Sequence, residues 1–225
     1  MANYEERPKI SGVVFDMDGL MFDTERMFLH VWEESGKAWG IDGILEIGYQ
    51  LLGVNATDTQ ELIHRLLPPE VDADAFYAFY KKNHAAYRET HPVVVKPGLY
   101  ELLHYLRRNG YKTAVASSTS RPIVMDNLCQ AQVTDFFDFI ICGDMVKHSK
   151  PNPEIYAIAC RELGLPPALC LALEDSPNGI RAARGAGMHP VLIPDMIAPS
   201  EEIIHLSLAC LKDLNRVIPL LERVR

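Results

Sequence analysis

Residues 10–19 read ISGVVFDMDG, an apolar run that ends in two aspartates and a glycine. An almost unbroken apolar run of this length is typical of a strand that is buried on both faces of a parallel sheet. Ligands of open α/β sheets bind outside the carboxyl ends of the strands, which is where Asp16 and Asp18 would stand. The segment therefore predicts a first strand that carries a carboxylate pair into a ligand-binding crevice.

Apolar runs alternate with helical stretches from residue 93 onward. Helices between these runs start near prolines and end before glycines, which is the usual asymmetry of helix ends. This alternation predicts βαβ units and an α/β fold with a doubly wound parallel sheet, a Rossmann-like core. The further strands are predicted over residues 111–117, 137–142, 169–174, 189–193 and 206–210, and the helices over residues 97–110, 152–164 and 176–187.

The stretch between the first strand and residue 93 has a different pattern. It shows helical periodicity and no convincing strand, and it contains both tryptophans of the chain. We interpret its dense aromatic residues mainly as the core of a small helical bundle. The sequence thus predicts a helical cap domain over residues 21–92, inserted into a discontinuous α/β core of residues 1–20 and 93–225.

The charge balance of the chain bears on its partners. Among 225 residues, 30 are Asp or Glu and 22 are Lys or Arg, which gives a formal net charge of −8. Binding to nucleic acids and anionic membranes depends on Lys and Arg, so neither partner is expected. The apolar stretches are far shorter than the ~20 residues that span a bilayer. No apolar segment follows the charged N-terminus, so no secretory signal is expected.

The cysteines and histidines give no metal-binding spacing. No C-x-x-C pair and no H-E-x-x-H motif is present, so a zinc site is not expected. The cysteines are predicted to be reduced, buried side chains of a cytoplasmic protein. They are Cys129, Cys142, Cys160, Cys170 and Cys210.

The Asp16-Met17-Asp18-Gly19 segment can carry chemistry. Asp16 can supply a carboxylate nucleophile, Asp18 a general acid and base, and both can coordinate a hard cation. An ordinary strand-to-loop turn is the simpler alternative, because Asp and Gly favour turns. A calcium loop of the EF-hand type is excluded, since Gly19 is the fourth position where that loop needs its glycine at the sixth.

Polar clusters also follow three other predicted strands. Ser117 and Ser118 begin a run of four hydroxyl residues before a helix, which suits either phosphate binding or simple N-capping. Lys150 precedes a proline-started helix and can hold a phosphoryl group, although an isolated lysine is more often solvated. Glu174 and Asp175 follow the strand at 169–174, and paired buried acids are costly without a cation. Chance turn chemistry does not explain all of these clusters together.

These clusters resemble the four ordered motifs of the haloacid dehalogenase-like superfamily, and the resemblance covers nearly the whole chain. More narrowly, residues 16–25 (DMDGLMFDTE) and 174–179 (EDSPNG) resemble the sugar- and nucleoside-phosphate phosphatases and the β-phosphoglucomutases of that superfamily. The resemblance implies an enzyme, a phosphatase that hydrolyses phosphoric monoesters of a small phosphorylated substrate through an aspartyl-phosphate intermediate. A monomer or weak homodimer is expected.

The resemblance also implies a role for each motif residue. Asp16 would be the nucleophile, Asp18 the acid and base, and Lys150 a third catalytic group. The phosphate-binding residues would be Ser117, Ser118, Lys150 and Gly19. The cofactor would be Mg²⁺, and its ligands would be Asp16, Asp18, Asp175 and Glu174.

Departures from the motifs separate activities within the superfamily. The dehalogenases lack the second aspartate of the first motif, which is present here as Asp18. The phosphonate hydrolases use a cap lysine close behind this motif, and residues 20–30 contain no lysine. Neither activity is therefore expected. Phe28 and Ala56 occupy the places of a histidine and an arginine in the β-phosphoglucomutases. A phosphatase is therefore favoured, with a phosphohexomutase of the β-phosphoglucomutase type as the alternative. A non-catalytic phosphate-binding module is a third possibility, which the presence of both Asp16 and Asp18 disfavours.

Overall fold

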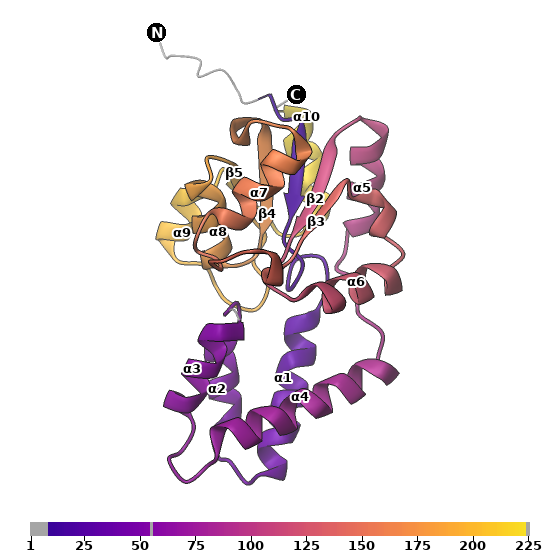
Figure 1. Cartoon of the computed structure of the whole chain (residues 1–225). Coiled ribbons are helices and arrows are strands. Elements are labelled where there is room, and N and C mark those ends of the chain that lie inside the picture. The colour runs from indigo at the N-terminus through magenta and orange to yellow at the C-terminus, as the bar shows by residue number, and fades with distance from the viewer. Residues whose placement is uncertain (1–8, 55, 224–225) are drawn as a thin grey trace.

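The computed structural model describes residues 9–54 and 56–223, except for the side chains of residues 56–58. Its described residues form one six-stranded, entirely parallel sheet with the order β3-β2-β1-β4-β5-β6 (Figure 1). The doubly wound α/β fold predicted above is therefore confirmed. The strands are β1 Gly12–Phe15, β2 Lys112–Ala116, β3 Phe139–Ile141, β4 Cys170–Glu174, β5 His189–Leu192 and β6 Ala209–Cys210.

Helices cover both faces of this sheet, and the glycines at 110, 164 and 187 follow helix ends as predicted. In the core the helices are α5 Leu99–Arg108, α6 Arg121–Gln130, α7 Glu154–Leu163, α8 Pro177–Gly185, α9 Glu201–Leu206 and α10 Val217–Arg223. Short 3₁₀ turns are formed by Thr134–Phe136, Gly143–Met145, Pro167–Leu169 and Leu214–Arg216.

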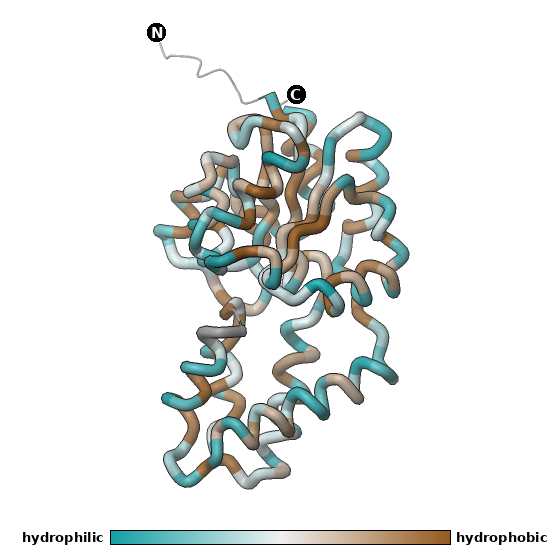
Figure 2. Tube along the Cα trace, viewed as in Figure 1, coloured by the Kyte–Doolittle hydropathy of each residue, from teal (hydrophilic) through white to brown (hydrophobic). Residues whose placement is uncertain are grey.

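Alternating side chains of each strand enter different halves of the core. Val13 and Phe15 pack with α5, α6 and α10, whereas Val14 packs with α7 and α8. Both faces are apolar because both are covered by helices, which explains the unbroken apolar runs in the sequence. Figure 2 shows this as brown strands between helices with teal outer surfaces.

The helical segment lies at one end of the molecule, and the carboxyl ends of the strands face it (Figure 1). Trp32 is fully buried at its centre, where Phe28, Phe76 and Tyr80 pack around it with ring centroids 5.1–5.7 Å away. These contacts confirm a separate aromatic core in the helical segment, while the domain boundaries at residues 20/21 and 92/93 stay a prediction. The helices are α1 Thr24–Ala38, α2 Ile44–Leu51, α3 Ala56–Leu66 and α4 Ala73–Thr90.

Two expectations from the sequence are wrong in detail. The strand predicted over residues 206–210 is reduced to β6, because Ser200 caps α9 by accepting from the Ile203 amide and the helix runs on to Leu206. Leu206 then packs against Ile203 instead of entering the sheet. The second error concerns the cysteines. All five are free, but only Cys142, Cys160 and Cys170 are buried, while Cys129 and Cys210 are exposed.

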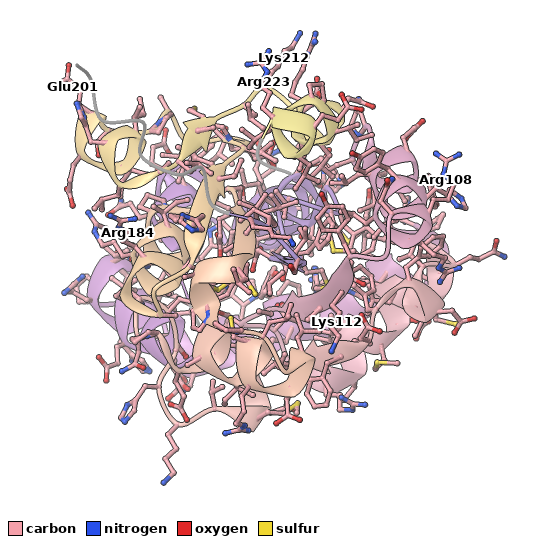
Figure 3. All side chains as sticks on the ribbon, turned by 90° about the horizontal axis from the view of Figure 1, so that it is seen from above. Arg108, Lys112, Arg184, Glu201, Lys212 and Arg223 are labelled. Atoms are coloured by element: carbon pink, nitrogen blue, oxygen red, sulfur yellow. The ribbon has the colours of Figure 1, made fainter. Side chains whose placement is uncertain are left out.

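The surface is polar around the sheet. Seen from above, Arg108, Arg184, Glu201 and Lys212 project from the periphery of the core (Figure 3). None of the helices in the described part of the chain combines the length and apolar character needed to cross a membrane.

Candidate active site

The pairing of β1 with β4 places two of the predicted site residues side by side. Phe15 is in register with Leu173, so the chain leaves the two strands at Asp16 and Glu174. The Asp16 amide donates to the Leu173 carbonyl at 3.0 Å, which continues the ladder by one residue. In the strand order found here, the connections run in opposite directions on either side of this pair, and such a switch point forms a crevice.

Lys150 lies at the centre of this crevice. Its ammonium group donates to Oδ1 of Asp16 at 2.5 Å, to Oε1 of Glu174 at 2.6 Å and to the Ala116 carbonyl at 2.9 Å. The residue is only 7% exposed, so it is not the solvated lysine that an isolated sequence position would suggest. A buried ammonium group that donates three hydrogen bonds, two of them to carboxylates, is well compensated.

Asp18 is held by three hydroxyl groups. Its Oδ1 accepts from Thr24 at 2.7 Å, and its Oδ2 accepts from Thr119 at 2.7 Å and from Ser117 at 3.3 Å. Ser117 is fully buried, and its own oxygen accepts from the Thr119 amide at 3.1 Å. The hydroxyl run after β2 thus contacts the second aspartate, and Ser118 lines the cavity beside it.

Asp175, in the loop after β4, lies against Gly19, in the loop after β1. Gly19 has a left-handed φ of +77°, and a Cβ placed on it would come 2.2 Å from Oδ2 of Asp175. Any side chain would therefore push the two loops apart. Carboxylate oxygens of Asp16, Glu174 and Asp175 lie within 4.8 Å of one another, which is close enough for one metal ion. The carboxylate of Asp18 is not part of that group among the described residues.

The concentration of acids shifts their pKa values. Burial raises the pKa of Asp16 to about 8; Lys150 opposes the shift, and Glu174 and Asp18 add to it. Burial, together with Asp16 and Glu174, also raises the pKa of Asp175 well above its usual value. Burial lowers the pKa of Lys150, but the two carboxylates more than offset this and hold it above its usual value. Such a site favours an additional cation.

A cavity of about 390 Å³ joins this crevice to the helical segment. Its floor contains Asp16, Asp18, Lys150 and Asp175, and its other wall is formed largely by α1, α4 and the connection between α2 and α3. From α4 it receives Tyr77, Tyr80, Lys81, His84 and Arg88. These positions are three or four residues apart, apart from the step between Tyr80 and Lys81, so they share one face of the helix.

The structure brings together every site residue predicted from the sequence and adds four to which the sequence gives no role. Thr24 and Thr119 donate to Asp18, and Tyr156 donates to Glu174 at 2.5 Å. Glu25 lines the same cavity, and burial, followed by the charges of Asp195 and Asp18, raises its pKa to about 7. Tyr156 lies in a helix with ordinary apolar spacing, so only its three-dimensional neighbours identify it.

Comparison with known proteins gives a consistent match. The family model for haloacid dehalogenase-like hydrolases matches residues 10–187. Protein CbbY of Cereibacter sphaeroides is 33% identical over 203 residues, which are 86% of this chain and 88% of that protein. A probable pseudouridine-5'-phosphatase of Drosophila melanogaster is 32% identical over 225 residues, covering 96% of this chain and 95% of its own.

A solved structure agrees with these relatives. The crystal structure of CbbY from Rhodobacter sphaeroides in complex with phosphate is similar to this chain with a TM-score of 0.75 and 30% identity. The match covers 92% of this chain and 96% of that one.

Proposed function

The chain belongs to the haloacid dehalogenase-like hydrolase family and to its phosphatase group, and we propose that it is a Mg²⁺-dependent phosphomonoesterase with Asp16 as nucleophile. The observation that carries this proposal is the bond between Lys150 and Asp16 inside an acidic cluster that suits one metal ion. Nucleophile, positive charge and cation ligands thus meet at one point, which is what phosphoryl transfer requires.

The donor set fits Mg²⁺. This ion prefers carboxylate oxygens and keeps several waters, so two or three protein ligands are enough. Asp16 and Asp175 would be the ligands of this ion, and Asp18 and Glu174 would lie beside the ligands. When bound, the ion would neutralise charge on the phosphoryl oxygens and help to orient the group. The raised pKa values of Asp16 and Asp175 support this, because a cation would remove the cost of their ionised forms.

The residues of the chain divide the reaction between them. An oxygen of Asp16 attacks phosphorus, the bond to the leaving oxygen breaks, and an aspartyl-phosphate forms on Asp16. Lys150 holds the phosphoryl oxygens, together with the hydroxyl groups of Ser117 and Ser118 and the loop at Gly19. Asp18 gives a proton to the leaving oxygen and then takes one from the water that cleaves the intermediate. It must exchange at least one of its three hydroxyl partners when the leaving group arrives.

The helical segment would recognise the leaving group. The cavity wall opposite the carboxylates carries Lys81, His84 and Arg88 beside the rings of Tyr77 and Tyr80. A small phosphorylated metabolite such as a sugar or nucleoside phosphate fits a wall of this mixed polar and aromatic character. The Drosophila relative, a probable pseudouridine-5'-phosphatase, supports a nucleoside phosphate among the candidates.

A phosphohexomutase is the second candidate, and the aromatic cavity wall disfavours it. Phe28 lines the cavity and stacks on Trp32 at 5.7 Å, so its side chain offers no hydrogen bond where the mutases place a histidine. The matching prediction for Ala56 concerns a side chain outside the described set. With β-glucose 1-phosphate and glucose 1,6-bisphosphate supplied, turnover should release inorganic phosphate. Efficient formation of glucose 6-phosphate without phosphate release would establish the mutase.

Two further proposals concern the setting of the enzyme. We place it in the cytoplasm, supported by its five free cysteines, and we expect a monomer or weak homodimer. Size-exclusion chromatography with light scattering would test the second point.

The function itself is tested by a substrate screen. Phosphate release from a panel of sugar and nucleoside monophosphates is measured with Mg²⁺ and with excess chelator. Mg²⁺-dependent release from at least one of them is the expected result, and no release from any member of a broad panel would contradict the proposal.

A further inference from the structure

Glu174 is the most completely enclosed acid of the site, with no exposed surface. Its Oε1 accepts from Lys150 at 2.6 Å and from the hydroxyl of Tyr156 at 2.5 Å. Its Oε2 accepts from the hydroxyl of Ser176 at 3.0 Å and from the Ser176 amide at 3.4 Å. The described residues therefore supply two donors to each oxygen, which is the normal capacity of a carboxylate.

The backbone of α8 closes the remaining side of this carboxylate. A Cβ placed on Gly179 would come 1.8 Å from the carboxyl carbon of Glu174 and 1.9 and 2.0 Å from its oxygens. The carboxylate therefore lies against the first turn of α8, in space that only a glycine leaves open. It cannot turn in that direction without displacing the helix.

From these contacts we propose that Glu174 is the counter-ion that fixes Lys150 against Asp16, rather than a ligand of the metal, and that Tyr156 is the positioning residue that holds Glu174 in this role. This inference rests on the proposed phosphatase function. The motifs imply four metal ligands, Asp16, Asp18, Asp175 and Glu174, and this inference removes Glu174 from that set.

The role of Tyr156 follows from its hydrogen bond to Oε1 of Glu174, the same oxygen that accepts from Lys150. Oxygens of Glu174, Asp16 and Asp175 lie within 4.8 Å of one another, so a metal ion bound by Glu174 would have to displace one of its hydrogen-bond donors. At Oε1 that donor would be Tyr156, which is fully buried, or Lys150, which is almost fully buried, and a buried donor without a partner is costly. Tyr156 is fully buried in α7, and its ring centre lies 5.0 Å from the Lys150 ammonium group. The Tyr156 hydroxyl thus holds Oε1 of Glu174 in the position where this oxygen accepts from Lys150.

The test uses two variants at this contact and measures Mg²⁺ binding as well as turnover. In Tyr156→Phe, kcat should fall about tenfold with KM changed less than about twofold, because one hydrogen bond to a charged group is lost. In Glu174→Gln, kcat should fall by about a hundredfold or more, since Lys150 loses its counter-ion. In both, the Mg²⁺ dissociation constant measured by titration calorimetry should rise far less than in Asp175→Asn, which removes a proposed ligand. Loss of a group that only supports a ligand already costs about 10–100-fold in metal affinity, so the ligand variant is the reference for this comparison.

Two controls accompany these variants. Asp175→Asn removes a proposed metal ligand and should weaken Mg²⁺ binding strongly. Tyr100→Phe removes a tyrosine hydroxyl that donates to the Ala131 carbonyl at 3.1 Å and does not line the cavity, so it should leave kcat unchanged.

The results that would overturn the proposal are distinct from those that would overturn the function. A Mg²⁺ affinity in Glu174→Gln as weak as that of Asp175→Asn would make Glu174 a ligand, and wild-type kcat in Tyr156→Phe would remove the positioning role. If Tyr156→Phe does not fold, calorimetry on Glu174→Gln still decides the role of the carboxylate. If the wild-type protein releases no phosphate from any substrate, the phosphatase function fails, and calorimetry still reports whether Glu174 binds the metal.

Discussion

The ammonium nitrogen of Lys150 lies 2.5 Å from Oδ1 of Asp16, although 134 positions separate the two residues in the chain. The contact exists because β1 and β2 are neighbours and the loop that carries Lys150 returns to the Ala116 carbonyl at the end of β2. The charge that phosphoryl transfer needs is thus in place beside the proposed nucleophile before any substrate arrives.

Removal of that charge should destabilise the protein as well as inactivate it. In Lys150→Met, the fully buried carboxylate of Glu174 loses its cation, and the carboxyl group of Asp16 loses a hydrogen-bond donor. Removal of one partner of a buried ion pair costs about 3–5 kcal/mol. Urea unfolding at pH 7.5 without Mg²⁺ should therefore give a free energy of unfolding lower by about 3 kcal/mol. A difference below about 1 kcal/mol would show that the lysine is not needed to balance these acids.

Metal removal should be reversible and selective. Chelation should abolish phosphate release, and added Mg²⁺ should restore it, because the charge of Asp16 and Asp175 has to be balanced while the phosphoryl group transfers. Ca²⁺ should substitute poorly, since it accepts looser geometry and more ligands than Mg²⁺. Full activity in excess chelator, verified by metal analysis, would contradict the proposed metal site.

The half-buried carboxyl group of Glu25 should make stability depend on pH. Its pKa is raised in the folded protein to about 7, with burial as the main cause, so folding favours its protonated form. Ionisation of Glu25 therefore lowers the free energy of unfolding, and this loss is absent below about pH 4.5, grows as the pH rises, and is complete above about pH 7. Glu25→Gln should stabilise the metal-free protein by roughly 2 kcal/mol at pH 8 and by almost nothing at pH 4. Thermal unfolding of both proteins at the two pH values measures this, and an equal effect at both would refute it.

Substitution of two neighbouring lysines distinguishes a contact with the substrate from a general effect of positive charge. Lys81 lines the cavity and Lys82 does not, although both lie on α4. For the best substrate of the screen, Lys81→Ala should raise KM about fivefold or more, as expected when a polar contact to the bound substrate is lost. Lys82→Ala is the matched control, because it removes the same charge one position away. Equal KM values for the two variants would argue against recognition by this face of α4.

The sequence predicts the sheet and the carboxylates well because these features are local. The apolar runs that form β1, β2 and β4 are buried on both faces, so their composition alone identifies them. Asp16 and Glu174 follow directly and need no knowledge of the fold to be noticed. The burial of Lys150 and its bonds to Asp16 and Glu174 do not follow from its neighbours in the sequence.

Residues that act through tertiary contacts could not be found in this way. Tyr156 has the spacing of an ordinary core residue in α7, and only the packing of α7 against β4 reveals its hydroxyl bond to Glu174. The apolar character of Leu206 favours a strand, whereas the cap at Ser200 starts a helix that runs on to this residue. The cavity face of α4 likewise depends on how the helical segment packs, which the periodicity does not determine.

The central claim, that Asp16 attacks the phosphoryl group, is tested most directly by one comparison. Wild-type protein and Asp16→Asn are assayed side by side for Mg²⁺-dependent phosphate release from the best substrate, with circular dichroism and thermal unfolding to verify the fold. The amide is nearly isosteric with the carboxylate but cannot form the aspartyl-phosphate, so release should fall by at least about 10⁴-fold, as expected when a nucleophile is lost. Substantial Mg²⁺-dependent release by a correctly folded Asp16→Asn protein would show that another group attacks phosphorus.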